Sequence, residues 1–572
     1  MENSMASDFR KRINDVVDYY LNNYKPICGR DKVIHDPIWG SVVYYKWEMQ
    51  IIDTPLFQRL RDIHQLGMAE YTYPAARHSR YEHSLGTVAI AFKMIERLKE
   101  RFSAESDSGN EAPITQNDVF AVRFAALLHD IGHCLYSHLS EQIYASMPEF
   151  EAIYKDVVES TEQKISPKPH EIFSYLIISS DSFCDFFFDS IDYPNKGNRE
   201  NCRILLKKIA NTVIGIKNDY FINGETVRKS YLTEILNSDF DADKLDYTQR
   251  DSHTAGIALT YGVERFLMKI VIHREETDDY TEYKLAVPED AQSTIEELIF
   301  NRNLLYVNIY RHQKILATED VMRDAIAGMV NTGIISHPCD FLYLSDKDIY
   351  ADCDSSEIPW KKEGSEKTFR SVLDKIDGRN LPKRCLVLDR GDFISTDENF
   401  AEKIDRSVEE IKRADSVRAR EILNDFGREY EASLFNSVVA GNVNRLRDAM
   451  GLGNYAAYTK VRNEWLEILC EKYKENGKSF DDIDFLDLNF VIPKLSGNKL
   501  GLCVVTNNDE IVDNDNFRYI RNWANSFFAD KWRGYFYVSD SVDRKLAADA
   551  ARELVCRKMN MISTFDIGKI IC

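Results

Sequence analysis

The chain has 572 residues, of which 44% are hydrophobic and 29% charged, so it can hold two or three folded domains. Its formal net charge of -20 argues against broad, non-specific nucleic-acid binding, which needs a basic surface. Eleven scattered Cys without a CxxC pair argue against a zinc ribbon or a thioredoxin-like motif. No apolar run approaches the roughly 18 residues of a membrane span, and no signal peptide is evident. We therefore expect a cytoplasmic protein that has no membrane partner and keeps its thiols reduced.

The predicted elements begin with β structure and continue as helices. Residues 32–45 read as two short β runs around a turn. Apolar residues then recur at helical spacing over residues 47–60. Residues 84–98 combine an apolar stripe with a charged face, which predicts an amphipathic helix. Residues 118–130 are nearly all apolar and predict a buried helix.

Helical periodicity continues over residues 203–215, 229–248 and 291–330, interrupted by a β segment at 279–287. Beyond residue 430 the pattern is mixed α and β. The predicted fold class is mainly α, a helical core with small β elements followed by an α+β C-terminal region. We divide the chain into an N-terminal extension (1–29), a catalytic domain (30–330) and a C-terminal region (331–572), for which we consider an oligomerisation or regulatory role.

A His-Asp pair, His129-Asp130, ends the predicted buried helix. Burying a carboxylate is costly unless it is paired or binds a metal. An adjacent imidazole and carboxylate can both reach one cation where the helix bends. The alternative is an ordinary helix C-terminus with a His near the dipole and Gly132 as the cap. By itself, such a short motif gives the two interpretations about even weight.

The surrounding sequence favours the metal. Six of the 12 His fall in one stretch of the chain, at 78, 83, 129, 133, 138 and 170. Asp239, Asp241 and Asp243 follow within the segment DFDADKLDYTQRD. Imidazole and carboxylate ligands together suit Fe, Mn, Zn or Ni. The pattern therefore indicates a transition-metal site with a catalytic shell of His around it.

Several long motifs carry a family resemblance. They occur in the order DPIWGSVVYY, IIDTPLFQRLRDIHQLG, ARHSRYEHSLG, LLHDIGHCLYSH and DADKLDYTQRDS. This order resembles the HD superfamily and, more closely, the deoxynucleoside triphosphate triphosphohydrolases, in the branch of the vertebrate SAM-and-HD-domain enzyme and its bacterial relatives. The likeness covers residues 30–330 and is faint over 331–572. We expect no SAM domain before the catalytic region.

The resemblance implies a fold built on a helical HD core and a set of site residues. The metal ligands would be His83, His129, Asp130 and Asp243, and the ion would bind the α-phosphate and activate a water, with Mg accompanying the triphosphate. The catalytic residues would be His138, His133, His170 and Glu141, of which His138 would be the general acid.

The same resemblance implies the substrate contacts. Arg80, Lys244 and Arg302 would hold the triphosphate, while Tyr247 and Asp251 would lie under the sugar and select deoxyribose. Tyr306, Tyr310, Gln65 and Leu66 would lie near the base, and Tyr306 replaces a His typical of the vertebrate branch. Composition alone leaves plainer readings open, in which the Tyr residues are core aromatics and Lys244 and Arg302 are solvated charges.

Activation by bound nucleotides is left open by the sequence. Asp53, Arg61 and Arg265 match positions that bind an activator in the vertebrate branch. However, His35 replaces an Asn, and LAVPEDAQST stands where a basic pair is expected. Asp53 and Arg61 have the alternative of a structural ion pair.

The predicted function is hydrolysis of deoxynucleoside triphosphates to deoxynucleoside and tripolyphosphate by a homo-oligomer, either a dimer or a tetramer. One alternative keeps the HD chemistry on a ribonucleotide, a cyclic dinucleotide or a signalling nucleotide. Another is a nucleotide-sensing binding protein, which the intact ligand set disfavours. The preferred base and the metal are left open.

Overall fold

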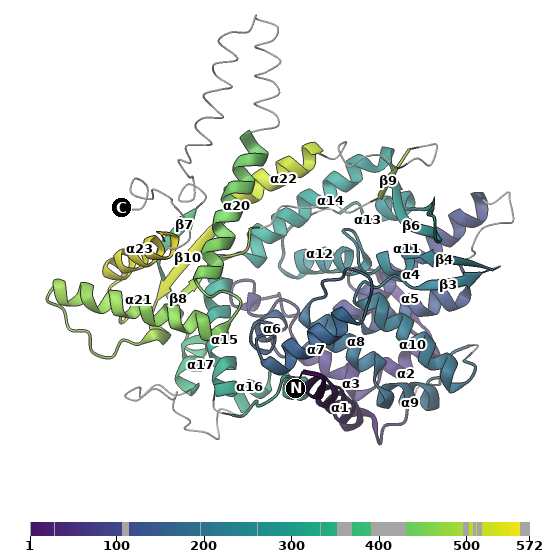
Figure 1. Ribbon diagram of the computed structural model, residues 1–572, viewed down its shortest axis with the longest axis horizontal. Coiled ribbons are helices and arrows are strands. Elements are labelled where there is room, and N and C mark those ends of the chain that lie inside the picture. The colour runs from purple at the N-terminus through teal and green to yellow at the C-terminus, as the bar shows by residue number, and fades with distance from the viewer. Residues whose placement is uncertain are drawn as a thin grey trace, which may run out of the picture. The chain divides into compact units, whose positions relative to one another are not determined.

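The protein is described by a computed structural model (Figure 1). It describes residues 2–27, 29–105, 114–194, 196–222, 224–259, 261–331, 333–351, 369–389, 431–495, 503–506, 511 and 518–560. The chain forms two compact units: unit 1 comprises residues 1–305, 329–356 and 500–516, and unit 2 comprises 306–328, 357–499 and 517–572. No helix in the described ranges is long and apolar enough to cross a membrane.

Unit 1 is mainly helical. Its helices are α1 (Glu2–Leu21), α2 (Lys46–Ile52), α3 (Pro55–Gln58), α4 (Arg80–Glu105), α5 (Gln116–Leu128), α6 (His138–Tyr144), α7 (Pro148–Glu159), α8 (Pro169–Ser179), α9 (Asp181–Ser190), α10 (Arg199–Val213), α11 (Ser230–Glu234), α12 (Ala242–Thr254), α13 (Val263–Lys269), α14 (Gln292–Leu305) and α16 (Asp348–Ala351). The central helix α4 packs against α5 and α12, and α10 packs against α5 and α8. The three helices α4, α5 and α12 carry the candidate site.

Two small sheets complete unit 1. Strands β1 (Lys32–Asp36) and β2 (Gly40–Tyr44) form an antiparallel hairpin. The second sheet has the order β3 (Asp219–Ile222), β4 (Glu225–Lys229), β6 (Thr281–Pro288), β5 (Val271–Glu276). Strand β9 (Cys503–Val505) pairs with β6 in parallel, so a segment from far down the chain closes part of this sheet.

Side-chain caps explain where the helices of the site begin. Thr115 and Asp118 form a reciprocal capping box at the start of α5. The Asp241 carboxylate accepts the Lys244 backbone N–H at 2.7 Å at the start of α12. The Asp241 cap lies at the end of α12 from which Asp243 projects, whereas the cap of α5 lies at the end opposite to His129 and Asp130.

Unit 2 combines helices with a three-stranded antiparallel sheet. Its helices are α15 (Gln313–Asn331), α17 (Phe369–Asp377), α20 (Glu431–Ala449), α21 (Tyr455–Glu475), α22 (Arg518–Lys531) and α23 (Arg544–Asn560), and its sheet has the order β7 (Lys383–Asp389), β10 (Arg533–Val538), β8 (Leu488–Val491). Figure 1 shows α23 and α21 beside this sheet. Trp465, Trp532 and Phe536 are fully buried in its core.

The structure confirms the predicted fold class of a mainly helical chain with small β elements. Two predicted helices are wrong as continuous elements. Residues 229–248 break between α11 and α12, because Asp241 caps a new helix there. Residues 291–330 break at a π-helical turn, Tyr306–Tyr310. The predicted domain boundary near residue 330 stays a prediction.

Candidate active site

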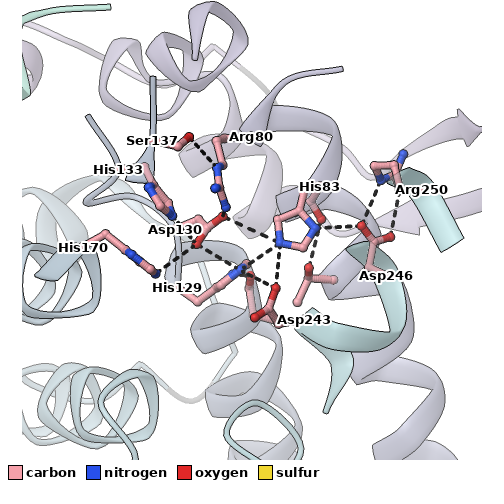
Figure 2. Close-up of polar contacts among 12 residues, drawn as sticks. Arg80, His83, His129, Asp130, His133, Ser137, His170, Asp243, Asp246 and Arg250 are labelled. Carbon is pink, nitrogen blue, oxygen red and sulfur yellow. Dashed lines mark hydrogen bonds and ion pairs between the residues drawn. The ribbon is translucent and has the colours of Figure 1, made fainter. Parts of the chain in front are cut away.

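The four predicted metal ligands come from the ends of three helices. His83 lies in the first turn of α4, His129 and Asp130 follow α5 directly, and Asp243 lies in the first turn of α12. Because α4 packs against both α5 and α12, these ends converge. The structure brings all four side chains together, as Figure 2 shows.

The donor atoms of His83, His129 and Asp130 lie close enough together to hold one metal ion, and Asp243 contacts His83 beside them. His83 Nε2 is 2.9 Å from Asp243 Oδ1, 3.3 Å from His129 Nε2 and 3.7 Å from Asp130 Oδ2. His129 Nε2 is 3.4 Å from Asp130 Oδ1 and 3.9 Å from Asp243 Oδ1. An ion with bonds of roughly 2.1 Å keeps neighbouring ligand atoms about 3.0–3.4 Å apart. Two carboxylates also balance the charge of a divalent ion.

The ring orientations and charges suit ligation as well. His129 Nδ1 donates to a backbone carbonyl of α5 at 2.8 Å, which leaves its Nε2 lone pair for the site. Burial lowers the pKa of His83, but hydrogen bonds to Asp243 and Asp246 outweigh it and raise the pKa to about 10. Burial also raises the pKa of Asp130 and Asp243, yet interactions with neighbouring His, Arg and Lys side chains hold the pKa of both carboxyls well below the usual range. Both carboxylates are therefore ionised, and an arriving cation would displace the His83 proton.

A second layer of buried charges holds His83. Asp246 accepts from His83 Nδ1 at 2.8 Å and from Trp39 Nε1 at 2.5 Å. Arg250 donates to both Asp246 oxygens at 2.9 Å and to Asp36 at 2.8 Å. Such a carboxylate behind a His ligand fixes the ring and raises its basicity. Sequence reasoning missed this layer, although the i,i+4 spacing of Asp246 and Arg250 on a predicted helix is a usable signal.

Gly86 makes room for that layer. A Cβ at this position would lie 1.9 Å from Asp246 Oδ1 and 2.2 Å from Arg250 Nη2. A side chain at position 86 would therefore push the Asp246–Arg250 pair away from His83.

The loop after α5 is held from two sides. Arg59 donates to the backbone carbonyls of Ile131 and His133, at 2.5 and 2.8 Å. Gly132 packs so closely on α8 that a Cβ would lie 2.4 Å from both the His170 carbonyl oxygen and the Ser174 backbone nitrogen. The loop is therefore fixed against α8. In the alternative interpretation Gly132 would be the cap of α5, but the residue that caps this helix is His129.

The predicted catalytic residues form one cluster beside the ligands. The Glu141 carboxylate accepts from His170 Nδ1 at 2.5 Å and from His138 Nδ1 at 3.0 Å. The rings of His133 and His170 stack at 3.8 Å, and His133 Nε2 lies 3.3 Å from Asp130 Oδ1. Both ring nitrogens of buried His133 lack a well-formed hydrogen bond among the described residues. Burial and nearby Arg80 lower the pKa of His133, so its ring is neutral.

Arg80 is already engaged within this site. Its Nη1 donates to Asp130 Oδ2 at 2.8 Å and its Nε to Ser137 Oγ at 2.9 Å (Figure 2). The guanidinium thus lies beside a predicted metal ligand, where it can meet a phosphate only by sharing these contacts.

Residues 80–186 match the HD domain family, and residues 272–467 match the HD associated region. The chain is an HD-domain protein. It is 28% identical over 372 residues to the deoxynucleoside triphosphate triphosphohydrolase SAMHD1 of Bos taurus, covering 62% of this chain and 59% of that protein. It is 28% identical over 369 residues to SAMHD1 of Homo sapiens, covering 62% and 54%. It is also 28% identical over 295 residues to the uncharacterized protein MJ1154 of Methanocaldococcus jannaschii, covering 52% and 49%. The chain thus spans between about half and three fifths of these relatives.

The predicted sugar and phosphate contacts of this HD-domain protein lie along α12 and nearby. Lys244 is partly exposed, and its Nζ lies 2.6 Å from Asp241. Tyr247 is half-buried, while Asp251 is buried and bonded to His78 Nε2 at 2.8 Å. Arg302 donates to the Asp239 carbonyl at 3.2 Å.

The residues predicted near the base divide between the units. Gln65 and Leu66 belong to unit 1, where Gln65 is buried and its Oε1 has no hydrogen-bond partner among the described residues. Tyr306 and Tyr310 belong to unit 2, with ring centroids 5.0 Å apart. Tyr306 also packs on Phe528 of that unit.

The positions linked to nucleotide activation have other partners. Asp53 pairs with Lys32 at 3.2 Å. Arg61 donates to Gln58 at 2.7 Å and lies 3.5 Å above the ring of Tyr81. Within the described part of the chain, the alternative of an Asp53–Arg61 ion pair is therefore wrong. Arg265 donates to Ser293 at 3.2 Å, and His35 Nδ1 lies 3.4 Å from Ser41 Oγ on the β1–β2 hairpin.

Proposed function

We propose that this chain hydrolyses deoxynucleoside triphosphates to deoxynucleoside and tripolyphosphate. The observation that carries the proposal is the convergence of two imidazoles and two ionised carboxylates, His83, His129, Asp130 and Asp243, within 2.9–3.9 Å of one another for the measured pairs. The substrate class rests on the activity for which the SAMHD1 relatives are named and on the motifs that resemble that family.

The four residues would hold Fe, Mn, Zn or Ni, and Mg would accompany the triphosphate. A bound ion would supply a Lewis acid for the α-phosphate and a water of lowered pKa. The water oxygen would become bonded to the α-phosphorus as the bond to the 5′-oxygen breaks, and the proton that the water loses would pass to solvent. His138 would give its proton to that leaving oxygen, with Glu141 holding its Nδ1. His133 and His170, which lie beside it, would line the path of the phosphate.

The substrate's charges would meet cationic groups already near the site. Lys244 stands next to ligand Asp243, so its Nζ can leave Asp241 for a phosphate oxygen, and Arg302 would contact the far end of the triphosphate. Arg80 would bind phosphate while it keeps its contact with Asp130. These three residues would offset most of the roughly four negative charges of the substrate.

Sugar selection would come from α12. Tyr247 would lie under C2′ and leave no room for a hydroxyl, and Asp251 would accept from the 3′-OH, while Gln65 and Leu66 would lie near the base. Tyr306 and Tyr310 would contact the base. A ribose hydroxyl would then be buried without a partner, at a cost of roughly 1–3 kcal/mol.

The test is incubation of the purified chain with each of the four dNTPs and NTPs in Mn or Mg, with products separated by ion-exchange chromatography. We expect deoxynucleoside and tripolyphosphate, and none from the Asp130→Ala variant. Equal turnover of NTPs would move the assignment to a ribonucleotide or signalling nucleotide. Binding without turnover would favour a nucleotide sensor. We also keep the expectations of a cytoplasmic location and of a homo-oligomer. Sedimentation with and without nucleotides would measure the oligomeric state.

A further inference from the structure

The turn that leads into His138 has an unfavourable backbone. Tyr136 and Ser137 have φ of 48° and 51°, in the left-handed region that residues with a side chain rarely adopt. Ser137 has a ψ of -115° and is the N-cap of α6, whose first residue is His138. Two such residues in succession persist only when their surroundings hold them. The direction in which His138 leaves the turn therefore depends on what holds it.

The carboxylate of Asp346 makes that hold. Its Oδ1 accepts the Tyr136 backbone N–H at 2.5 Å. Its Oδ2 accepts both the backbone N–H of His64 at 2.8 Å and His64 Nδ1 at 2.6 Å. Asp346 is 4% exposed, and its own N–H donates to the Asp62 carbonyl at 3.0 Å. One buried carboxylate thus joins the turn to the 62–64 segment.

The same connection continues to a predicted metal ligand. Ser137 Oγ donates to the His64 carbonyl at 2.9 Å and accepts from Arg80 Nε at 2.9 Å. Arg80 then donates to Asp130 at 2.8 Å. Displacing the turn would therefore move His138 on one side and release Arg80 on the other.

We propose that Asp346 is a positioning residue of the active site, which fastens the Tyr136–Ser137 turn and thereby places His138 and Arg80 for the reaction. The catalytic part of this role rests on the proposed function, since it assumes that His138 and Arg80 act on a phosphate substrate. The statement that Asp346 holds the turn does not depend on the proposed function. The residue lies 210 positions from Tyr136 in the chain, outside the segment that matches the HD domain.

Hydrogen exchange tests the hold without any substrate. Asp348→Ala is the matched control, because Asp348 lies two residues after Asp346 and its carboxylate accepts the backbone N–H and the hydroxyl of Ser345. In the full chain loaded with Mn, Asp346→Ala should speed amide exchange across residues 134–140 by about tenfold or more, while the control leaves it unchanged. Unchanged exchange in Asp346→Ala would overturn the proposal.

Kinetics test the catalytic part. Asp346→Ala should lower kcat by about tenfold to hundredfold with full metal content, and Asp346→Asn by less, because its amide oxygen still accepts one N–H. In a His138→Ala background the same substitution should lower kcat by a smaller factor than in the wild type, since the part of its effect that passes through His138 is already lost and only the part through Arg80 remains. Fully additive losses would refute the catalytic part.

Two further outcomes keep the readings separate. His64→Ala leaves the bond to Tyr136 intact, so its kcat should change by less than about threefold. If Asp346→Ala fails to fold, the kcat of Asp346→Asn is compared with that of His64→Ala. An equal loss of kcat in the two variants would overturn the proposal that Asp346 acts by holding the Tyr136–Ser137 turn. If the wild-type chain hydrolyses no nucleotide, the proposed function fails, while the exchange result still decides whether Asp346 holds the turn.

Discussion

Replacing Asp246 with Asn should weaken metal binding without removing any metal ligand. The carboxylate is fully buried, accepts from His83 Nδ1 at 2.8 Å, and is the negative partner that fixes the ring. Asn keeps the size but loses the charge. Outer partners of this kind are worth about tenfold to hundredfold in metal affinity. That corresponds to about 1.4–2.8 kcal/mol.

The same substitution should lower the free energy of unfolding. Arg250 lies 2.9 Å from Asp246 and is 2% exposed in its side chain. Breaking a buried pair costs about 3–5 kcal/mol. Because Asp36 stays within 2.8 Å of the same guanidinium, we expect the lower end of that range.

The assay separates these two effects. Metal affinity is measured by competition with a chelator of known affinity, and stability by urea unfolding of the metal-free chain. Asp36→Asn is the matched control, since Asp36 also binds Arg250 at 2.8 Å. It should lose stability and keep its metal affinity within about threefold. An Asp246→Asn variant that loses stability yet binds metal as the wild type does would refute the reasoning.

Three further predictions follow from the same site. Gly132→Ala should lower the free energy of unfolding by at least about 1–3 kcal/mol, measured in urea, because its Cβ meets the backbone of α8 at 2.4 Å; an unchanged midpoint would show that α8 yields. Tyr247→Ala should bring kcat/KM for dGTP and GTP closer together, from a wild-type preference of about tenfold or more, which is about 1.4 kcal/mol; an unchanged ratio would exclude this ring as the sugar gate. The hydrogen bond to Asp346 raises the pKa of His64 above 6.5, although burial alone would lower it. The protonated ring therefore stabilises the fold fully below pH 6.5, and this contribution is lost as the pH rises through the pKa of His64 in the folded protein. The stability difference between wild type and His64→Gln should therefore shrink from pH 6 to pH 8.5, and a constant difference would contradict this.

The sequence predicted that His83, His129, Asp130 and Asp243 would lie together, because these residues stand in long motifs whose order carries the family resemblance, while their role as metal ligands stays a prediction. His83 and Asp243 are far apart in the chain, yet each occupies the first turn of a helix, where its side chain can reach a shared point. The role assigned to each site residue stays a prediction.

The i,i+4 spacing of Asp246 and Arg250 indicates a pair on one helix face, but the sequence does not show that this pair supports His83, for a physical reason. Asp246 is one of several acids in DADKLDYTQRD, and only packing of α12 on α4 decides that it meets His83. Asp346 stands in a segment without any catalytic motif. Likewise, helical periodicity reports only on neighbouring residues, so the helix predicted over residues 229–248 runs across a break that the Asp241 cap imposes.

The late position of strand β9 in the chain affects when its sheet can be completed during synthesis. It fills part of one edge of β6, beside Ala286 to Pro288, yet it lies at Cys503–Val505. A ribosome adding roughly 5–20 residues per second would deliver β9 roughly 10–40 s after β6, since roughly 200 residues separate them. During that interval the nascent chain carries an open edge at this end of β6, the kind of surface that pairs with other chains. Chaperone capture during synthesis would therefore be expected there, and a chain cut before residue 503 would keep that edge open permanently.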